Sequence, residues 1–485
     1  MRSPNFTRKI IYALAILFLF GAMYPYSQWL NDEKRVKGLG EATIGQVDTG
    51  SFMLKLALLG GARGIAANVL WTRAEELKRE QDWDKMAATV DLITKLQPHF
   101  LSVWTFQGWN LAYNVSVEWD APEDKYDWIK KGIKFLQEGV SKNEKSPDLI
   151  WDTAWTYYHK LGFADESIIL RKLFRDDSDE AFKTYTDPDS GQKVIGNDNF
   201  LLGYGWFSDS VHLVDAGAQR TATGTETNLD YVDATPQRKG RPGDLAFRSM
   251  PAHAITRYSS GLEKASMIDV PATFGEVARI SWSRALNEWV KFGEYPFPAY
   301  NDQSVLIKID DISIPERFKK LSANAYYWTE RWADQMNYRY WKDRCSAEMT
   351  SDGVRARQLF YEGTLAYKTS DFETAVAKFR DGLKIWDELL KKHTNYRNDE
   401  FNKKDTGLIA LRYQKALIQQ GEPEPKDMPF RDLIAGAEQD NTRDPFDAVE
   451  MLGAGKPGAP PTQPTLPRPA AAPRSVPTPK LQTPK

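Results

Sequence analysis

Residues 356–387, ARQLFYEGTLAYKTSDFETAVAKFRDGLKIWD, contain the pattern that decides the fold. Ala375, Phe379 and Gly382 follow one another at spacings of four and three, which places them on one face of a helix. The two small residues let a neighbouring helix approach, and the large residue fills the space between them. The same spacing recurs in Gly132-Leu136-Gly139, in Ala278-Trp282-Ala285 and, most loosely, in Met86-Val90-Ile93. An internal repeat of this kind predicts an all-α architecture built from helical repeats.

Two of these helices have an expected partner helix immediately upstream. The partner leads into a turn made of a polar residue, an aspartate and an aromatic residue: Gln81-Asp82-Trp83 in one case and Ser370-Asp371-Phe372 in the other. Ala74 and Gly108 occupy the same small position 34 residues apart, and Ala154 follows 46 residues later. The arrangement resembles the 34-residue tetratricopeptide repeat. Because one unit cannot bury its own apolar face, the resemblance implies an α-solenoid. An ordinary helical bundle with coincidental spacing is the alternative.

The pattern also divides the chain into segments. Three local expectations follow from periodicity: a short helix around 206–214, a short strand at Ser304–Ile309, and one long helix from Phe318 to Met349. The expected segments are a cytoplasmic tail and transmembrane signal anchor (1–31), a linker and first packing helix (32–66), tetratricopeptide-like repeats (67–185), an irregular loop-rich insertion (186–250), a helical repeat pair (251–300), a short extended segment (301–317), a long helix with a C-terminal repeat (318–420), a polar connection (421–452) and a proline-rich tail (453–485).

The proline-rich tail has a composition unlike the rest of the chain. Residues 453–485 contain ten prolines, five basic residues and no acid. Such a segment lacks the apolar side chains needed for a core, so we expect it to be disordered with polyproline II character.

Composition limits the classes of function. The chain has 485 residues, a formal net charge of −2 and an apolar content of 41%. This balance gives no electrostatic indication of a nucleic-acid partner, and none is expected. The single cysteine, Cys345, excludes a disulfide framework and sites built from several cysteines.

An uncharged segment near the N-terminus predicts a membrane anchor. Residues 10–31 carry no charged side chain, and at 1.5 Å per residue a helix of that length crosses a bilayer core. Arg2, Arg8 and Lys9 precede it. Bulky residues stand where a signal peptidase needs small ones, so an uncleaved anchor is favoured over a cleaved signal peptide. The expected location is the inner (cytoplasmic) membrane, single-pass, with the bulk of the chain on the extracytoplasmic, periplasmic side.

Residues for catalysis or metal binding do not form a known pattern. None of the five histidines has another histidine three or four positions away, and no nucleophile elbow, zinc-protease or kinase signature is present. The sequence therefore indicates a protein that is not an enzyme, with no cofactor and no metal.

Aromatic residues form the more informative pattern. In a tetratricopeptide array, fixed positions of each first helix line a groove, and the resemblance carries this role to matching positions here. The expected partner-binding residues are Trp71, Arg79, Trp109, Tyr113, Trp151, Trp155, Tyr158, Phe360 and Tyr367, with His159 at a further groove position. Large aromatics beside basic side chains are typical of binding hot spots. The alternative is that later elements, such as the 186–250 segment, cover these rings and make them core.

Three further stretches resemble a more specific family: 97–116, 60–67 and 285–293. They are similar to membrane-anchored helical repeat proteins common in planctomycete bacteria, which often carry the label "iron-responsive element". The similarity covers roughly residues 50–390. That label names an RNA hairpin, and the family offers no catalytic residues to transfer to this chain.

These observations favour one function over two alternatives. The expected function is a membrane-anchored extracytoplasmic scaffold or adaptor that binds a protein or peptide partner in a helical-repeat groove. The second is a cell-envelope protein that binds or processes carbohydrate with the same aromatic surface. The third is a structural element of a larger envelope complex.

Overall fold

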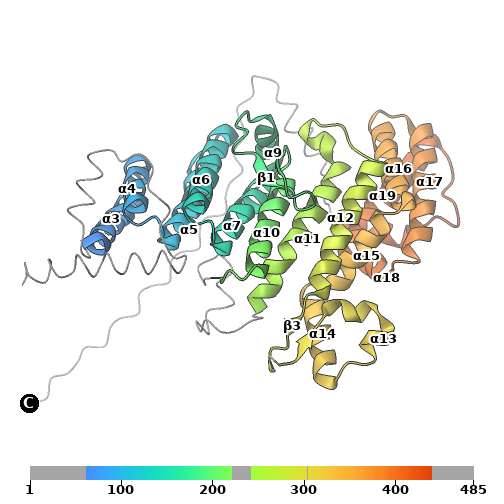
Figure 1. The fold of residues 1–485 in the computed structure, drawn as a ribbon. Coiled ribbons are helices and arrows are strands. Elements are labelled where there is room, and N and C mark those ends of the chain that lie inside the picture. The colour runs from blue at the N-terminus through green and yellow to red at the C-terminus, as the bar shows by residue number, and fades with distance from the viewer. Residues whose placement is uncertain (1–61, 221–241, 303, 440–485) are drawn as a thin grey trace, which may run out of the picture. The chain divides into compact units, whose positions relative to one another are not determined.

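The computed structural model describes residues 62–220, 242–302 and 304–439, and helices dominate these ranges (Figure 1). The helices are α3 (Ala62–Arg79), α4 (Trp83–Leu96), α5 (Leu101–Trp109), α6 (Pro122–Lys142), α7 (Pro147–Trp155), α8 (Leu161–Phe163), α9 (Ser167–Asp176), α10 (Asn199–Asp215), α11 (Pro242–Leu262), α12 (Glu276–Glu294), α13 (Pro315–Phe318), α14 (Ala323–Gln335), α15 (Tyr338–Glu348), α16 (Ser351–Lys368), α17 (Phe372–Leu390), α18 (Thr394–Asn398), α19 (Glu400–Gln420) and α20 (Ile434–Gln439).

Shorter elements connect these helices. Two are π-helical, η1 (Asn110–Val115) and η3 (Thr156–Lys160), and four are 3-10 turns, η2 (Ser116–Glu118), η5 (Ala265–Ile268), η6 (Ile309–Ser313) and η7 (Arg431–Leu433). Within the described ranges the strands form two antiparallel pairs, β1 (Thr184–Thr186) with β2 (Lys193–Ile195) and β3 (Phe297–Pro298) with β4 (Leu306–Ile307). The strand expected at Ser304–Ile309 is thus present as β4, in a shorter form.

Two helical hairpins, α3–α4 and α16–α17, are closed by the same turn. In the first, Gln81 has a positive φ of 58°, and the amide of Asp82 donates to the carbonyl of Leu77 at 3.0 Å. In the second, Ser370 has a φ of 61°, and the amide of Asp371 donates to the carbonyl of Ala366 at 2.9 Å. These hydrogen bonds satisfy helix-end carbonyls in the manner of a Schellman motif.

The aspartate of each turn also begins the next helix. The side chain of Asp82 accepts from the amide of Lys85, and that of Asp371 accepts from the amide of Thr374. A side-chain oxygen at this position satisfies an amide that has no partner within the helix. The turn pattern seen in the sequence therefore predicted the two hairpins, although Trp83 and Phe372, expected in the turns, are the first residues of α4 and α17.

Small residues set the close approach between paired helices, as the repeated spacing predicted. A Cβ atom added to Gly132 of α6 would lie 2.7 Å from the carbonyl oxygen of Gly108 on α5. One added to Gly382 of α17 would lie 2.8 Å from the ring of Phe360 on α16. A Cβ atom does not fit at such distances. The helices can therefore approach this closely only because glycine stands at both positions.

The remaining helices pack largely on neighbours in chain order. α7 contacts α6 and α10, α10 contacts α11, α11 contacts α12, α12 contacts α15, and α17 contacts α19. The largest buried apolar cluster spans α7 and η3, then α10 to α12, and extends to α15. A second buried apolar cluster is formed by residues of helices α15 to α20. This order of contacts is typical of stacked helical repeats.

The described residues contain no helix that is long and apolar enough to cross a membrane. The anchor predicted at 10–31 and the tail at 453–485 lie outside the described residues.

Two sequence predictions were wrong in detail. The helix expected around 206–214 is α10, which begins already at Asn199 and runs for 17 residues. Gly203 and Gly205 lower the intrinsic helix propensity of its first half, but Gly203 fits closely against Tyr158, and the aspartate Asp198 caps the helix. Tertiary packing outweighs propensity here.

The single long helix expected from Phe318 to Met349 is two helices, α14 and α15, and Phe318 itself ends the short α13. α14 and α15 are separated at Asn337, which adopts a left-handed conformation with a φ of 47°. Asparagine tolerates this conformation better than most residues, so the chain can reverse there although the apolar spacing continues through it.

Candidate functional site

The candidate site begins with two π-helical turns at equivalent places in successive repeats. α5 continues directly into η1, and α7 continues directly into η3. η1 begins at Asn110 and η3 at Thr156, 46 residues apart, the same separation as between Gly108 and Ala154. π-Turns inside α-helices widen the helix locally and are frequent at functional sites.

Rings from the two turns stack on one another. The ring of Trp109 lies 5.9 Å from that of Tyr113, and Tyr113 lies 5.9 Å from His159 across the helix interface. His159 in turn stacks on Trp155 at 4.8 Å, with 10° between the ring planes, and on Phe163 at 5.9 Å. We refer to these five residues as the aromatic ladder. Offset or parallel ring pairs of this kind add stability beyond the area they bury.

The two ends of the ladder are accessible to solvent. Trp109 is 37% exposed and Phe163 is 42% exposed, whereas Tyr113, Trp155 and His159 are half-buried. The two exposed rings leave apolar surface available for contact at both ends of the ladder.

Two cations lie over the ladder. The ammonium of Lys160 is 5.2 Å from the centre of the Tyr113 ring, and the guanidinium of Arg257, from α11, is 5.1 Å from that of Phe163. Cations in these positions are attracted by the electron-rich ring faces. The surface therefore combines apolar rings with positive charge.

The titratable groups of the ladder are neutral at neutral pH. Burial lowers the pKa of His159 below its usual 6.5, and the adjacent Lys160 lowers it further. Burial raises the pKa of the Tyr113 hydroxyl, which lies 3.2 Å from Nδ1 of His159. The ladder itself thus presents uncharged rings, and its charge comes from the flanking lysine and arginine.

The structure brings five of the nine predicted residues together: Trp109, Tyr113 and Trp155 lie in the ladder, and the rings of Trp151 and Tyr158 lie 5.3 and 6.1 Å from that of Trp155. Trp151 and Tyr158 were also expected to line an open groove, and that expectation was wrong because both are buried. Their rings pack edge-on against Phe207 of α10. Helix α10, which belongs to the 186–250 segment, covers these two rings, as the alternative interpretation of the sequence proposed.

The other four predicted residues take part in different contacts. Trp71 is half-buried and packs on Phe106, with 5.3 Å between ring centres, and Arg79 is exposed at the end of α3. Phe360 is buried against Trp386 between α16 and α17, so its assignment to a groove was wrong. Tyr367 is half-buried beside Phe372.

Sequence reasoning missed Phe163 and Arg257. Phe163 follows His159 by four residues, so helical spacing alone could have placed both rings on one face. Arg257 comes from a helix far along the chain, and no local pattern indicates that its side chain reaches Phe163.

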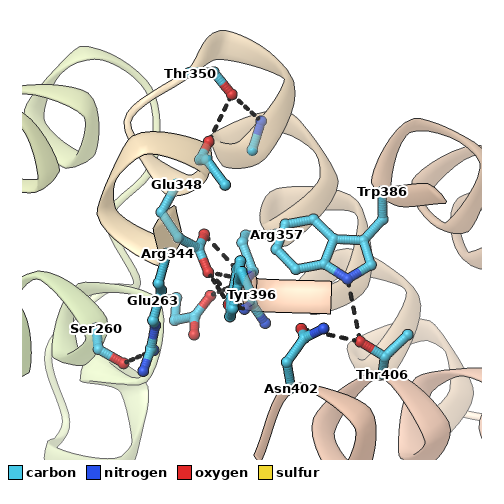
Figure 2. A network of polar contacts seen from close by, with 12 residues as sticks. Ser260, Glu263, Arg344, Glu348, Thr350, Arg357, Trp386, Tyr396, Asn402 and Thr406 are labelled. Carbon is cyan, nitrogen blue, oxygen red and sulfur yellow. Dashed lines mark hydrogen bonds and ion pairs between the residues drawn. The ribbon is translucent and has the colours of Figure 1, made fainter. Parts of the chain in front are cut away.

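A polar cluster, separate from the aromatic ladder, lies where α11, α15, α16 and α18 meet (Figure 2). Arg357 of α16 donates through Nη2 to Oε1 of Glu348 at 2.6 Å, and its guanidinium stacks 4.5 Å from the ring of Trp386. The hydroxyl of Tyr396 donates to the same Glu348 oxygen at 2.7 Å. Arg344 reaches across to Ser260 of α11 at 3.1 Å. Arg357 pairs with Glu348 and, at 3.8 Å, with Glu263, and Arg344 is held by neutral hydroxyl groups, so we interpret this cluster as a buried joint between helices.

The described residues offer little to a catalytic mechanism. They contain no group of three or more histidine, cysteine or acidic side chains that could hold a metal ion. Burial raises the pKa of the Cys345 thiol to about 12, so this thiol stays protonated and unreactive at neutral pH.

Comparisons of this chain with protein-family models, with curated proteins and with solved structures found no match.

Proposed function

We propose that this protein is a membrane-anchored, tetratricopeptide-like scaffold or adaptor that binds a protein or peptide through the aromatic ladder. The observation that carries the proposal is the continuous stacking of Trp109, Tyr113, His159 and Trp155 across two repeats. We propose that the protein is related to the planctomycete family of membrane-anchored helical repeat proteins, which has the same expected architecture.

The chemistry of the ladder favours binding over catalysis. Rigid rings supply contact area at a low cost in side-chain entropy, and tryptophan, tyrosine and arginine are the residues enriched at binding hot spots. The partner would place apolar side chains on Trp109 and Phe163 and a carbonyl or carboxylate near Lys160 or Arg257. No ionised nucleophile or base lies among these rings.

The anchor predicted at 10–31 would hold this surface close to a bilayer, on the extracytoplasmic side. A partner in the same membrane would then meet the ladder at a raised effective concentration. A small contact area on the ladder would therefore be sufficient for binding.

Carbohydrate is the second candidate ligand, because the partly exposed ring of Trp109 could stack on a sugar. A purified partner and a set of cell-wall oligosaccharides distinguish the two candidates when each is titrated against the full-length protein. Binding of the protein partner that is weakened by Trp109→Ala supports the proposal. Binding of an oligosaccharide alone, weakened by the same change, replaces it with the second candidate.

Exposed Phe401 of α19 offers a matched control, since Phe401→Ala removes a similar area far from the ladder in sequence. We expect Trp109→Ala to weaken partner binding at least about tenfold, the usual scale of a central aromatic contact, and Phe401→Ala to leave binding unchanged.

A further inference from the structure

Residues 297–302 and 304–337 form an excursion from the packed helices. α12 contacts α15 directly, although about forty residues separate them in the chain. Those residues form the β3–β4 hairpin, η6, α13 and α14, which pack on one another (Figure 1). Since α12 and α15 are already in contact, stacking of the repeats does not require this excursion, and we ask what it presents to its surroundings.

The excursion carries a concentration of exposed aromatic and aliphatic side chains. Tyr300 is 66% exposed, Leu306 is 61% exposed, and Tyr326 and Tyr327 are also exposed on α14. The half-buried ring of Trp328 lies 5.7 Å from Tyr300 and 5.1 Å from Tyr327, so the hairpin and the helix share one aromatic surface. We refer to these five residues as the hairpin surface.

The hairpin surface is rigidly supported. The indole of Trp328 donates to Oδ1 of Asn301 at 2.6 Å, and Nδ2 of Asn301 donates to Asn324 at 3.0 Å. Beneath the surface, Ile307 and Thr329 are fully buried. The central ring of Trp328 is therefore held by a hydrogen bond, and the surface rests on packed residues.

Exposed cations outnumber exposed acids around this surface. Among the described residues from 297 to 337 all five basic side chains are exposed, whereas three of the six acidic ones are, namely those of Asp302, Glu316 and Asp334. The exposed basic side chains are those of Lys308, Arg317, Lys319, Lys320 and Arg331.

Some of these cations have no acidic partner. Lys308 and Arg317 share Glu294, whereas Lys319, Lys320 and Arg331 form no ion pair with any described residue. Arg331 follows Tyr327 by four residues on α14, so this cation lies on the same helical face as that ring.

We propose that the hairpin surface docks on the headgroup region of an anionic lipid bilayer. Tyrosine and tryptophan concentrate at membrane–water interfaces because their rings are apolar and their hydroxyl or imino groups are polar. Leu306 would enter the acyl boundary, while the lysines and arginines would remain among the phosphates. The unpaired Lys319, Lys320 and Arg331 favour the phosphates of an anionic lipid over an uncharged carbohydrate, and an acidic protein surface is the alternative that the test below distinguishes.

A local probe tests this proposal in the full-length chain. Ala323 is exposed one helical turn before Tyr327, and Cys345, the one native cysteine, is buried. Ala323→Cys can therefore be labelled selectively with an environment-sensitive nitrobenzoxadiazole fluorophore. Ser141→Cys, at an exposed position of α6, gives a matched control label. The readout reports on the immediate surroundings of each label and does not depend on how the rest of the chain associates with a bilayer.

We expect the label at 323 to shift to the blue and to be quenched by nitroxide lipids in phosphatidylcholine–phosphatidylglycerol vesicles, and the label at 141 to remain in water. The effect should weaken in pure phosphatidylcholine and at high salt. Lys319→Gln and Lys320→Gln should each raise the amount of anionic lipid needed about fivefold, since each cation near such a surface contributes on the order of 1 kcal/mol. Lys384→Gln, an exposed lysine of α17, should have no effect.

Equal exposure of the two labels to water in anionic vesicles would overturn the proposal. So would a shift of the label at 323 that oligosaccharides or a purified protein cause and vesicles do not. Neither result bears on the aromatic ladder, because the two surfaces are probed by different residues.

Discussion

The hydroxyl of Tyr113 lies 3.2 Å from Nδ1 of His159, and the two residues occupy equivalent positions 46 residues apart in successive repeats. Each follows a tryptophan by four residues, Trp109 in one repeat and Trp155 in the other. Because both repeats contain a π-turn at this place, equivalent side chains meet across the interface and form one stack. Repetition of a sequence pattern has thus produced a surface that neither repeat contains alone.

Close packing of α5 and α6 predicts that Gly132→Ala destabilises the protein. The new Cβ would lie 2.7 Å from the backbone oxygen of Gly108 and 2.9 Å from the amide nitrogen of Ala112, and backbone atoms cannot move aside cheaply. We expect a loss of about 1–3 kcal/mol, the usual cost of overpacking, measured by thermal unfolding of the full-length protein.

Gly436→Ala is the matched control for this change. Gly436 lies in helix α20, and an added Cβ meets nothing within 4 Å. The same substitution should therefore stabilise that helix by about 0.5–1 kcal/mol, because alanine loses less backbone entropy than glycine. Equal effects of the two substitutions would contradict the packing described for α5 and α6.

The buried joint predicts a large effect of Arg357→Met. The substitution leaves the carboxylate of Glu348, whose side chain is 2% exposed, without its ionic partner, and only the hydroxyl of Tyr396 still donates to it. Breaking a buried pair from one side costs about 3–5 kcal/mol. Hydrogen exchange over α15 and α16 would reveal the loss as earlier local opening.

Two further variants separate charge from packing at this joint. Arg357→Met combined with Glu348→Gln should regain part of the lost stability, because the carboxylate of Glu348 is then absent, although Glu263, 3.8 Å from Arg357, still lacks that partner. Arg355→Met, on the exposed side of the same helix, should change stability by less than about 0.5 kcal/mol. A loss from Arg355→Met as large as that from Arg357→Met would show that the joint is not the cause.

His253 predicts a loss of stability in acid. Its ring lies edge-on between Trp289 and Trp341, and burial, with a smaller contribution from Arg257, lowers its pKa from 6.5 to about 4. Between these values the unfolded chain binds a proton that the folded chain does not. The free energy of unfolding must therefore fall as the pH falls from 6.5 to 4, by up to about 3 kcal/mol.

His253→Gln removes this titration, so its thermal unfolding should depend less steeply on pH over the same range. Other groups, including His159, are common to both proteins and cancel in the comparison. Parallel stability curves for the two proteins between pH 7 and pH 4 would refute the role assigned to His253.

The sequence allowed the helical hairpins to be predicted because their determinants are local. A positive-φ residue, a capping aspartate and a small residue at fixed spacing each act within a few positions, as at Gln81, Asp82 and Gly132. The break at Asn337 was missed because apolar spacing continues through it, and one residue in a left-handed conformation is enough to end a helix.

The candidate site was predicted only in part, for a different reason. Spacing shows which residues share a helical face, but it does not show what covers that face. Trp151 and Trp155 share a face of α7, yet α10 covers the first and leaves the second partly accessible. The covering helix contains Gly203 and Gly205, which made its sequence appear irregular. The hairpin surface depends in the same way on a loop and a helix that meet only in three dimensions.

Site-specific crosslinking in intact cells tests the central claim most directly. A photoreactive benzoylphenylalanine at position 109 of the full-length chain should yield one discrete adduct with a protein partner, and Phe163→Ser in the same chain should abolish it. The same probe at position 401, an exposed position of α19, should not form that adduct. The same adduct at both positions, or none at position 109, would contradict partner binding at the aromatic ladder.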